Sequence, residues 1–262
     1  MIDRLSIRER LPQIEVAAAD NATALVFRVL DAPSDGDLEV LRAFGVDHGF
    51  SIYLQPGNEE TIAPIDANAP ALYYELPAFD ARLYFRPNDF VQIHAGINRQ
   101  MIETALAALD VSADETVLEL FSGLGNFSVP LARSGARVVT VEGEAGLVGR
   151  ARDNALANGC TNIEAHVDNL FEPSEAPNWL PASVDKVLLD PPRSGAAEVI
   201  DLIAAKAPSR IVYCSCHPAT LARDAERLVH EHGYRLASAG VMDMFPHTAH
   251  IESMAVFDKE PG

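Results

Sequence analysis

The sequence predicts an α/β protein in which a doubly wound parallel sheet is preceded by a smaller α+β unit. From about residue 97 onward, short apolar strands alternate with amphipathic helices, which is the pattern of parallel βαβ units. Residues 1–90 instead contain five strand-like segments and one helical segment, which indicates an antiparallel sheet with a helix on one face. We therefore expect two domains, residues 1–90 and residues 91–262.

The individual elements follow from apolar runs, side-chain periodicity and turn residues. In the first domain we expect strands at 13–18, 24–30, 50–55, 71–76 and 81–85, and a helix at 37–49 capped by Ser34 or Asp35. In the second domain we expect strands at 116–120, 137–142, 162–167, 186–190 and 210–215, followed by a terminal apolar strand after Glu252. Helices are expected at 97–108, 127–134, 145–158, 196–205 and 218–231.

Composition excludes several classes of protein. The 262 residues include 48% hydrophobic and 22% charged side chains, which is near the globular average and argues against disorder. No apolar stretch is long enough to span a membrane, and no secretory signal is recognisable. Three cysteines cannot form a disulfide framework, so we expect a reduced, cytoplasmic protein. We also expect a monomer. The net charge of −18 by itself argues against nucleic-acid binding.

A glycine turn provides the main cofactor signal. The segment Glu119-Leu-Phe-Ser-Gly-Leu-Gly-Asn-Phe-Ser128 runs from a strand through Gly123 into a helix, and glycine lets the backbone approach a ligand closely. A carboxylate at Glu119 would repel pyrophosphate but accept hydrogen bonds from a cationic amino acid, so S-adenosylmethionine fits better than a dinucleotide. Glu142, at the next strand end, suits two ribose hydroxyls, and Asp168-Asn169 is placed to meet an adenine edge.

Three further segments carry the candidate catalytic groups. Asp190 ends a strand and is held by Pro191 and Pro192, which fix the backbone. Cys216 lies between a strand end and a helix N-terminus, where we expect the thiol pKa to be lowered, and is the candidate nucleophile. Glu252 precedes the terminal strand and is the candidate general base. A zinc site formed by Cys214 and Cys216 with His217, His247 and His250 is the rival interpretation. The Cys-x-Cys spacing is not the two-residue gap that is usual in zinc sites, so we expect no metal.

Four of these segments, at 119–132, 188–196, 215–224 and 243–254, together with Asp89-Phe-Val-Gln-Ile93, resemble the RNA 5-methyluridine methyltransferases. The final Glu-Ser-Met is most similar to the bacterial branch that acts on 23S ribosomal RNA, of the uridine-1939 type. The resemblance implies a Rossmann-like class I methyltransferase domain. It also implies methyl transfer from S-adenosylmethionine to carbon 5 of a uridine through a covalent Cys216–uracil adduct, with Glu252 removing the carbon-5 proton.

The resemblance further assigns the cofactor-binding positions, which are Gln92, Phe121, Gly123, Asn126, Glu142, Asn169 and Asp190. Asp190 is also expected to orient the base. The sequence departs from the family's usual Cys at Ser122 and its usual Asn at His94 and His217.

Members of this branch resemble three-part proteins with an N-terminal TRAM barrel, a central domain with an iron–sulfur site, and the methyltransferase domain. We expect this chain to begin inside the central domain, as a truncated form or a short relative. With no cysteine before Cys160, it is expected to lack the cluster.

Two other functions stay open at this point. A 5-methylcytidine RNA methyltransferase would place its nucleophilic cysteine after the prolines, where this chain has Arg193. A cofactor-binding RNA module with weak or no catalysis would fit the acidity. Because 17 of the 20 basic residues are Arg, a local RNA-binding patch is compatible with the charge, but weak binding of ribosomal RNA is expected.

Overall fold

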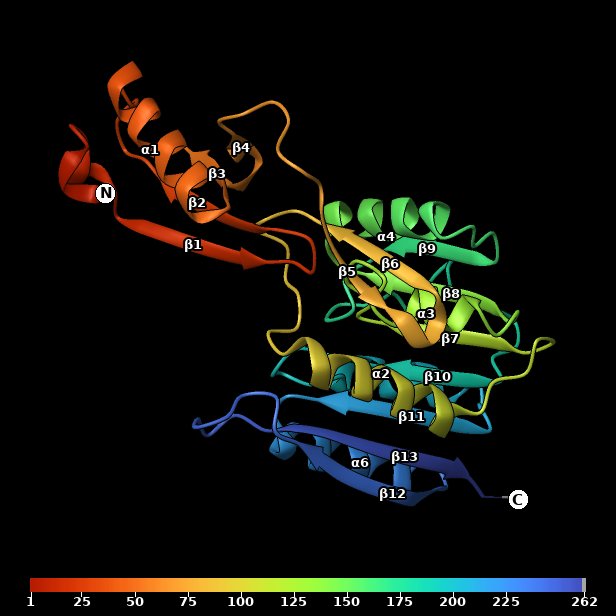
Figure 1. Cartoon of the computed structure of the whole chain (residues 1–262). Coiled ribbons are helices and arrows are strands. Elements are labelled where there is room, and N and C mark those ends of the chain that lie inside the picture. Colours follow the sequence, from red (N-terminus) through yellow and green to blue (C-terminus); the bar gives the residue numbers. More distant parts are fainter. Residues whose placement is uncertain (261–262) are drawn as a thin grey trace. The chain divides into compact units, whose positions relative to one another are not determined.

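A computed structural model describes residues 1–260 (Figure 1). The chain divides into two compact units, one made of Met1–Glu75 with Tyr84–Phe90 and the other of Leu76–Leu83 with the chain from Val91 onward. The segment Leu76–Leu83, expected in the first domain, thus packs with the second unit. No helix in the described part of the chain is long and apolar enough to cross a membrane.

The first unit is built on a mixed four-stranded sheet in the order β1-β2-β3-β4. Its strands are β1 (Gln13–Ala18), β2 (Thr23–Arg28), β3 (Phe50–Gln55) and β4 (Ala63–Pro64), and short 3-10 turns lie at Ile2–Arg4, Arg8–Arg10 and Glu59–Thr61. Helix α1 (Asp35–His48) connects β2 to β3, which are therefore parallel, whereas the other two pairs are antiparallel.

The expected antiparallel sheet of five strands is therefore wrong. The 14-residue helix α1 returns the chain to the end of the sheet at which β2 begins, so β3 starts there and runs parallel to β2. Strands β5 (Leu72–Leu76) and β6 (Ala81–Phe85) pair only with each other, through the 3-10 turn Pro77–Phe79.

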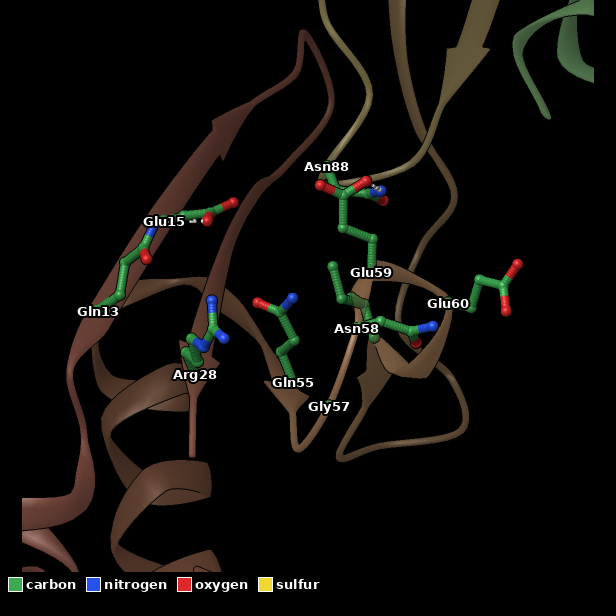
Figure 2. Close-up of a pocket in the computed structure, with 10 residues that line it drawn as sticks. Gln13, Glu15, Arg28, Gln55, Gly57, Asn58, Glu59, Glu60 and Asn88 are labelled. Atoms are coloured by element: carbon green, nitrogen blue, oxygen red, sulfur yellow. Dashed lines mark hydrogen bonds between the residues drawn. The ribbon is translucent and has the colours of Figure 1, made fainter. Parts of the chain in front are cut away.

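One face of the first sheet is apolar and packs on α1. Leu25, Phe27 and Ile52 from this face join Leu41 of α1 in a buried cluster. The opposite face carries a polar row, because Gln13 pairs with Arg28 and Arg28 pairs with Gln55 in the strand register (Figure 2).

The second unit contains a seven-stranded sheet in the order β12-β13-β11-β10-β7-β8-β9. Its strands are β7 (Thr116–Leu120), β8 (Arg137–Glu142), β9 (Ile163–Val167), β10 (Lys186–Leu189), β11 (Arg210–Ser215), β12 (Tyr234–Met242) and β13 (Glu252–Lys259). Its helices are α2 (Ala95–Leu109), α3 (Ser128–Ala132), α4 (Ala145–Ala157), α5 (Ala197–Ala204) and α6 (Pro218–His230). Strands β7 to β11 are parallel, and β13 is antiparallel to both of its neighbours.

Helices cover both faces of this sheet. Helices α2, α3 and α4 contact one another and the sheet, whereas α5 and α6 contact each other, with α6 lying against β11, β12 and β13 (Figure 1). Alternate residues of the central strands, among them Val187, Leu189 and Tyr213, are fully buried in a core with α5 and α6. The predicted Rossmann-like, doubly wound sheet is therefore confirmed. Strand β12 was not expected, and β13 departs from the all-parallel arrangement.

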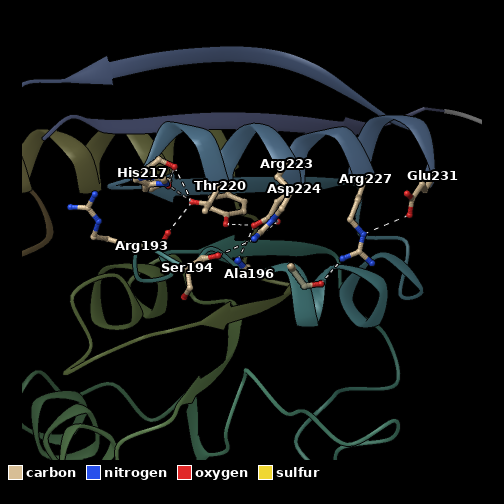
Figure 3. Close-up of polar contacts among 12 residues, drawn as sticks. Arg193, Ser194, Ala196, His217, Thr220, Arg223, Asp224, Arg227 and Glu231 are labelled. Atoms are coloured by element: carbon tan, nitrogen blue, oxygen red, sulfur yellow. Dashed lines mark hydrogen bonds and ion pairs between the residues drawn. The ribbon is translucent and has the colours of Figure 1, made fainter. Parts of the chain in front are cut away.

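A buried carboxylate fixes the turn after β10 against helix α6 (Figure 3). Asp224 is fully buried, and its Oδ2 accepts hydrogen bonds from the Tyr213 hydroxyl at 2.7 Å and the Ala196 amide at 2.8 Å. Its Oδ1 accepts from Arg223 Nε at 2.8 Å, and Arg223 also donates to the Ser194 carbonyl. Gly195 lies in this turn with φ +82°, and a Cβ there would lie 2.7 Å from Asp224 Oδ2.

A second contact ties the same turn to the loop that holds Cys216. The Thr220 hydroxyl lies 3.2 Å from the Arg193 carbonyl oxygen and 2.9 Å from the His217 carbonyl oxygen. The loops after β10 and β11 therefore share one polar connection, which the beginning of α6 supplies.

We expect Asp224→Asn to lower the free energy of unfolding by about 2–4 kcal/mol, because either orientation of the amide turns NH2 toward a buried donor. Urea unfolding followed by circular dichroism measures this loss. Glu226→Gln, on the exposed side of the same helix, is the matched control and should change the free energy by less than about 0.5 kcal/mol. Equal stability of the two variants would contradict the assigned role.

Candidate functional site

The carboxyl ends of the parallel strands bring the candidate site residues to one edge of the second sheet. Glu119 lies near the end of β7, Glu142 ends β8, and Asp190 follows β10. Burial raises the pKa of Glu119, and the charges of Asp190 and Glu142 raise it further, which indicates that these three carboxylates lie close together. This edge is where open α/β sheets bind their ligands.

Glu119 is the most deeply buried of these acids. Its side chain is 1% exposed, and Oε2 accepts a 2.6 Å hydrogen bond from the Ser128 hydroxyl at the start of α3. Burial raises its pKa to about 8, the Ser128 bond opposes this rise, and the nearby carboxylates add to it. Its other oxygen, Oε1, is buried and has no hydrogen-bond partner among residues 1–260. A positively charged donor would satisfy both the charge and this oxygen.

The turn after β7 folds back sharply over the sheet edge. Phe121 has φ +65°, and Gly123 and Gly125 have φ +55° and +100°. The amides of Phe121 and Ser122 both donate to the Val141 carbonyl, at 2.9 and 3.3 Å. Nothing lies within 4 Å of a Cβ built on Gly123, so the backbone is open to a ligand there.

Glu142 is held by backbone amides on both sides. Oε2 accepts from the Gly123 amide and Oε1 from the Glu144 amide, each at 3.0 Å. These bonds orient the carboxylate at the end of β8 and leave further acceptor capacity on each oxygen for hydroxyl groups.

The predicted residue Asn126 has a buried polar partner, Asn98, that was not expected from the sequence. Asn98 of α2 is 4% exposed and exchanges two amide hydrogen bonds with Asn126, at 2.9 and 3.1 Å. The buried positions of α2 are Asn98, Met101, Ile102, Ala105 and Leu109, so one polar residue stands in an otherwise apolar stripe. That break in the stripe is the signal by which the sequence could have indicated Asn98.

Gln92 precedes α2 and carries a second orphaned acceptor. Its Oε1 is buried without a hydrogen-bond partner within the described part of the chain. Nearby in sequence, His94 caps α2, since its Nδ1 accepts from the Ile97 amide at 3.2 Å. The substitution of His for the family's usual Asn thus retains a capping acceptor.

The end of β9 is organised around Asp168. Its Oδ2 accepts from Trp179 Nε1 at 2.6 Å and its Oδ1 accepts from the Asn169 amide. Asn169 is exposed and its Oδ1 accepts from the Phe171 amide. The Phe121 and Phe171 rings lie 5.8 Å apart, so an aromatic pair flanks this end of the sheet.

The ladder between β11 and β13 ends beside Cys216 and Glu252. Cys214 pairs with Met254 and Ser215 pairs with Ser253 in this antiparallel ladder, and Cys216 and Glu252 are the residues that adjoin its last pair. The charge of Glu252 acts on the Cys216 thiol, so the two groups lie close together. The Ser253 hydroxyl also donates to the Ser215 carbonyl at 3.0 Å. Glu252 is only 3% exposed, so it is not a solvated surface carboxylate.

The electrostatics of this pair differ from one sequence-based expectation. Burial raises the pKa of the Cys216 thiol, the Glu252 and Asp190 charges raise it further, and Arg193 opposes them. The expectation that the N-terminus of α6 lowers the pKa of Cys216 is therefore wrong. Burial of the thiol and the charges of two acids outweigh the effect of the helix on this pKa. Burial also raises the pKa of Glu252, and burial together with the Glu252 charge raises that of Asp190 to about 7.

Arg193 is the cation nearest to this acidic group in the turn after β10. It is exposed, and its Nη1 lies 3.1 Å from His250 Nδ1 in the loop that leads to Glu252. Because its charge lowers the pKa of Cys216, it favours the thiolate.

The zinc interpretation receives no support from the arrangement of side chains. Within residues 1–260, the one group of three or more potential metal ligands is Asp201, Glu231 and His232. Asp201 there already accepts hydrogen bonds from Arg227 and His232. Cys214 and Cys216 do not belong to any such group.

The structure thus gathers Glu119, Glu142, Asp190, Cys216 and Glu252 at one sheet edge, and the two orphaned acceptors of Glu119 and Gln92 fit a cationic ligand with hydrogen-bond donors. A thiol close to a buried carboxylate is an arrangement that would suit a nucleophile and a base. The individual roles of the nine site residues remain predictions.

The family model and the named relatives that match this chain indicate the same family of proteins. The family model for tRNA (uracil-5-)-methyltransferase matches residues 65–169 and 181–260. The chain is 54% identical over 261 residues to a 23S rRNA (uracil(1939)-C(5))-methyltransferase RlmD of Alkalilimnicola ehrlichii, covering 99% of this chain and 59% of the relative. It is 51% identical to the RlmD of Methylococcus capsulatus over 260 residues, covering 99% and 59%. The chain therefore spans less than two thirds of the length of these relatives.

Solved structures agree on the fold. A Pyrococcus abyssi tRNA (uracil-54, C5)-methyltransferase in complex with S-adenosyl-L-homocysteine superposes with a TM-score of 0.71 at 24% identity, over 92% of this chain and 58% of that one. P. horikoshii TYW2, in complex with MeSAdo, gives 0.62 at 13% identity over 97% and 94%. With the class I methyltransferase fold and a family model that matches most of its length, the chain belongs to the tRNA (uracil-5-)-methyltransferase family.

Proposed function

We propose that this chain transfers a methyl group from S-adenosylmethionine to carbon 5 of a uridine in 23S ribosomal RNA through a covalent Cys216–uracil adduct. The observation that supports the proposal is the end of the β11–β13 ladder, where Cys216 lies close to the buried Glu252 and to Asp190. The substrate follows from the RlmD relatives, whose names state a 23S rRNA uracil as target.

The proposed cofactor site is the edge formed by Gln92, Phe121, Gly123, Asn126, Glu142, Asn169 and Asp190. The Pyrococcus abyssi structure contains S-adenosyl-L-homocysteine, the demethylated product of the same cofactor. S-adenosylmethionine supplies an electrophilic methyl on a sulfonium, and its ammonium group suits the orphaned Glu119 Oε1. Glu142, whose carboxylate is oriented by two amides, suits the ribose hydroxyls.

The chemistry of uracil explains why a thiol and a base are both needed. Carbon 5 is a weak nucleophile, so the Cys216 thiolate first bonds to carbon 6 and the displaced π electrons form an enolate. The enolate carbon 5 takes the methyl group, and Glu252 accepts the carbon-5 proton. The returning electrons expel Cys216 from carbon 6, which restores the thiolate. Both ring faces must be accessible, so the nucleotide has to leave its stack.

Asp190 is proposed to orient the uracil by its polar edge as well as to contact the cofactor. Because its pKa is raised to about 7, both its protonated and ionised forms are populated near neutral pH. A protonated carboxyl donates a hydrogen bond and an ionised one accepts, so Asp190 can pair with a carbonyl or with an N–H of the base.

The 5-methylcytidine alternative is disfavoured because Arg193, not a cysteine, follows Pro192. The non-catalytic alternative is disfavoured because Cys216 lies close to the buried Glu252. We also propose that the chain is a monomer and is cytoplasmic, in keeping with three free cysteines.

The adduct is the direct test of this proposal. With 5-fluorouridine-substituted 23S fragments and S-adenosylmethionine, the chain should form a covalent complex, because fluorine at carbon 5 cannot leave as a proton does. Cys216→Ala should abolish the complex. Glu252→Gln should lower turnover on ordinary RNA by about 10²–10⁴-fold and accumulate the methylated adduct.

Cys160→Ala is the matched control, since Cys160 lies outside the sheet edge, after α4, and should leave adduct formation unchanged. Denaturing gels and mass spectrometry of the complex provide the measurement. An adduct that survives Cys216→Ala would refute the assignment, as would cofactor binding without any adduct.

The pKa of Glu119 gives a pH-dependence prediction. Because its pKa in the folded protein is about 8, above its ordinary 4.5, the proton-linked stability is fully present below about 4.5 and is lost as pH rises through about 8. The free energy of unfolding of the ligand-free chain should therefore fall with pH, by at most about 1.4 kcal/mol per pH unit for this group.

Glu119→Gln should reduce this slope, most clearly between about pH 7 and 8, because Asp190, with its pKa of about 7, contributes mainly below that range. Urea unfolding at a series of pH values measures the change. The exposed Glu103 of α2 gives the matched control, because Glu103→Gln removes the same charge and should leave the slope intact. A slope unaffected by Glu119→Gln would show that another group carries it.

The net charge predicts weak attraction to RNA. Residues 1–90 carry 7 basic and 15 acidic side chains, and residues 91–262 carry 13 and 23, so neither part is basic. We expect S-adenosylmethionine to bind with ordinary affinity by calorimetry, and bulk ribosomal RNA to bind with a Kd above about 1 μM at physiological salt. Submicromolar binding in a filter assay would contradict this.

A further inference from the structure

The first unit carries a polar pocket on the side of its sheet opposite α1 (Figure 2). Its volume is about 540 Å³, and its floor is the row Gln13, Arg28 and Gln55, one residue from each of three neighbouring strands. Glu15 lies two residues along β1, on the same face as Gln13. Because α1 covers only the other face, the strand backbone holds these side chains in fixed register beside an open space.

Two of the floor residues have unused hydrogen-bonding capacity. Gln55 is 6% exposed, and its carboxamide makes no hydrogen bond within residues 1–260 although it lines the pocket. Arg28 is exposed and forms no ion pair among the described residues, despite the acidity of its surroundings. The Gln55 carboxamide and the Arg28 guanidinium, on neighbouring strands, are therefore both open to a ligand in the pocket.

The opposite wall is the segment after β3. It contributes Gly57, Asn58, Glu59 and Glu60, and Glu59 Oε2 accepts from Asn88 Nδ2 at 3.3 Å. Figure 2 shows Gln55 between Arg28 on one side and Asn58 and Glu59 on the other. The pocket thus presents carboxylates and carboxamides around one guanidinium.

This set of groups is selective for one kind of ligand. Three carboxylates, Glu15, Glu59 and Glu60, against one guanidinium disfavour a phosphate. The planar fork of Arg28 needs two adjacent acceptors, which guanine offers at O6 and N7 and unpaired cytosine at O2 and N3. The carboxylates need adjacent donors, and of these two bases only guanine presents them, at N1–H and N2–H2 on its Watson–Crick edge. A volume of this size is within the range of small-molecule pockets.

We propose that this pocket binds an unpaired guanine base of a single-stranded RNA segment, with Arg28 donating to O6 and N7 and a carboxylate accepting from N1 and N2. Single-stranded bases are commonly read on these edges by proteins. The proposal rests on the proposed function, since it takes the RNA substrate as the source of the base. It assigns the first unit a sequence-reading role that is separate from the Cys216 site.

Adenosine-flanked heptamers with one central guanosine or adenosine test this without offering a uracil to Cys216 or a competing pair of adjacent acceptors to Arg28. We expect the guanosine heptamer to bind at least about tenfold more tightly than the adenosine one, measured by fluorescence anisotropy. Backbone amide shifts in a ¹⁵N spectrum should move at Gln55 and Gly57. Arg28→Gln should remove the preference for guanosine, and Glu15→Gln should reduce it, which provides a second variant should either fold poorly.

Arg8→Gln is the matched control, because it removes the same charge from the first unit outside the pocket and should keep the preference. Excess free guanosine distinguishes the source of the base. If guanosine alone binds as tightly as the heptamer, the ligand is a nucleoside and the RNA proposal is overturned. Equal binding of the two heptamers, or a preference retained in Arg28→Gln, overturns it as well.

The outcome is distinguishable from failure of the proposed function. Loss of the guanosine preference with an intact Cys216 adduct would overturn only the pocket. An absent adduct with an intact preference would overturn only the methyl transfer.

Discussion

The antiparallel pairing of β13 with β11 is the constraint on which the site depends. Parallel strands alone would bring Glu119, Glu142, Asp190 and Cys216 to one edge, because each lies at a carboxyl end. Glu252 reaches the same edge because β13 runs antiparallel to β11 and therefore starts there. The last pair of the ladder, Ser215 with Ser253, adjoins Cys216 and Glu252, so the pairing of the two strands positions both groups.

The same edge concentrates negative charge, which makes ionisation of its carboxyl and thiol groups less favourable. Burial raises the pKa of Glu119 to about 8 and of Asp190 to about 7, and the remaining charges oppose ionisation of Cys216. In the folded chain without ligand, protonation relieves this repulsion. A cationic ligand would relieve it differently, by restoring the ionised carboxylates, and its positive charge would also favour the Cys216 thiolate. Cofactor binding and nucleophile activation are thus linked through the same acids on the proposed mechanism.

Much of this arrangement was accessible from the sequence. The bounds of β1, β3, β7, β8 and β11 follow from apolar runs bounded by turn residues, and the Rossmann-like sheet follows from their alternation with helices. What sequence reasoning missed depended on contacts between distant segments. The parallel β2–β3 pair needed the path of α1, and β12 is a long edge strand with seven consecutive exposed residues and no burial pattern.

The site shows the same division. Cys216, Glu252 and Asp190 stand in recognisable local patterns, but the pKa of Cys216 is raised by burial and by the charge of Glu252, which is 36 residues away in the chain and is brought near through the sheet. Asn98 was missed because its partner Asn126 lies on another element, although its place in the apolar stripe of α2 marks it as unusual. Local sequence identifies chemical groups, whereas their electrostatics depend on register and burial.

The charge distribution constrains how this chain could recognise the RNA substrate proposed for it. Both the sheet edge of the second unit and the pocket of the first unit contain more carboxylates than cations. Such sites cannot draw their specificity from phosphates, which they repel. They suit bases, whose N–H groups carboxylates accept and whose ring carbonyls a lone Arg or a protonated Asp190 can meet. Acidity that argues against a phosphate-tracking surface is therefore compatible with base recognition, in which each contact is a hydrogen bond to a neutral ring.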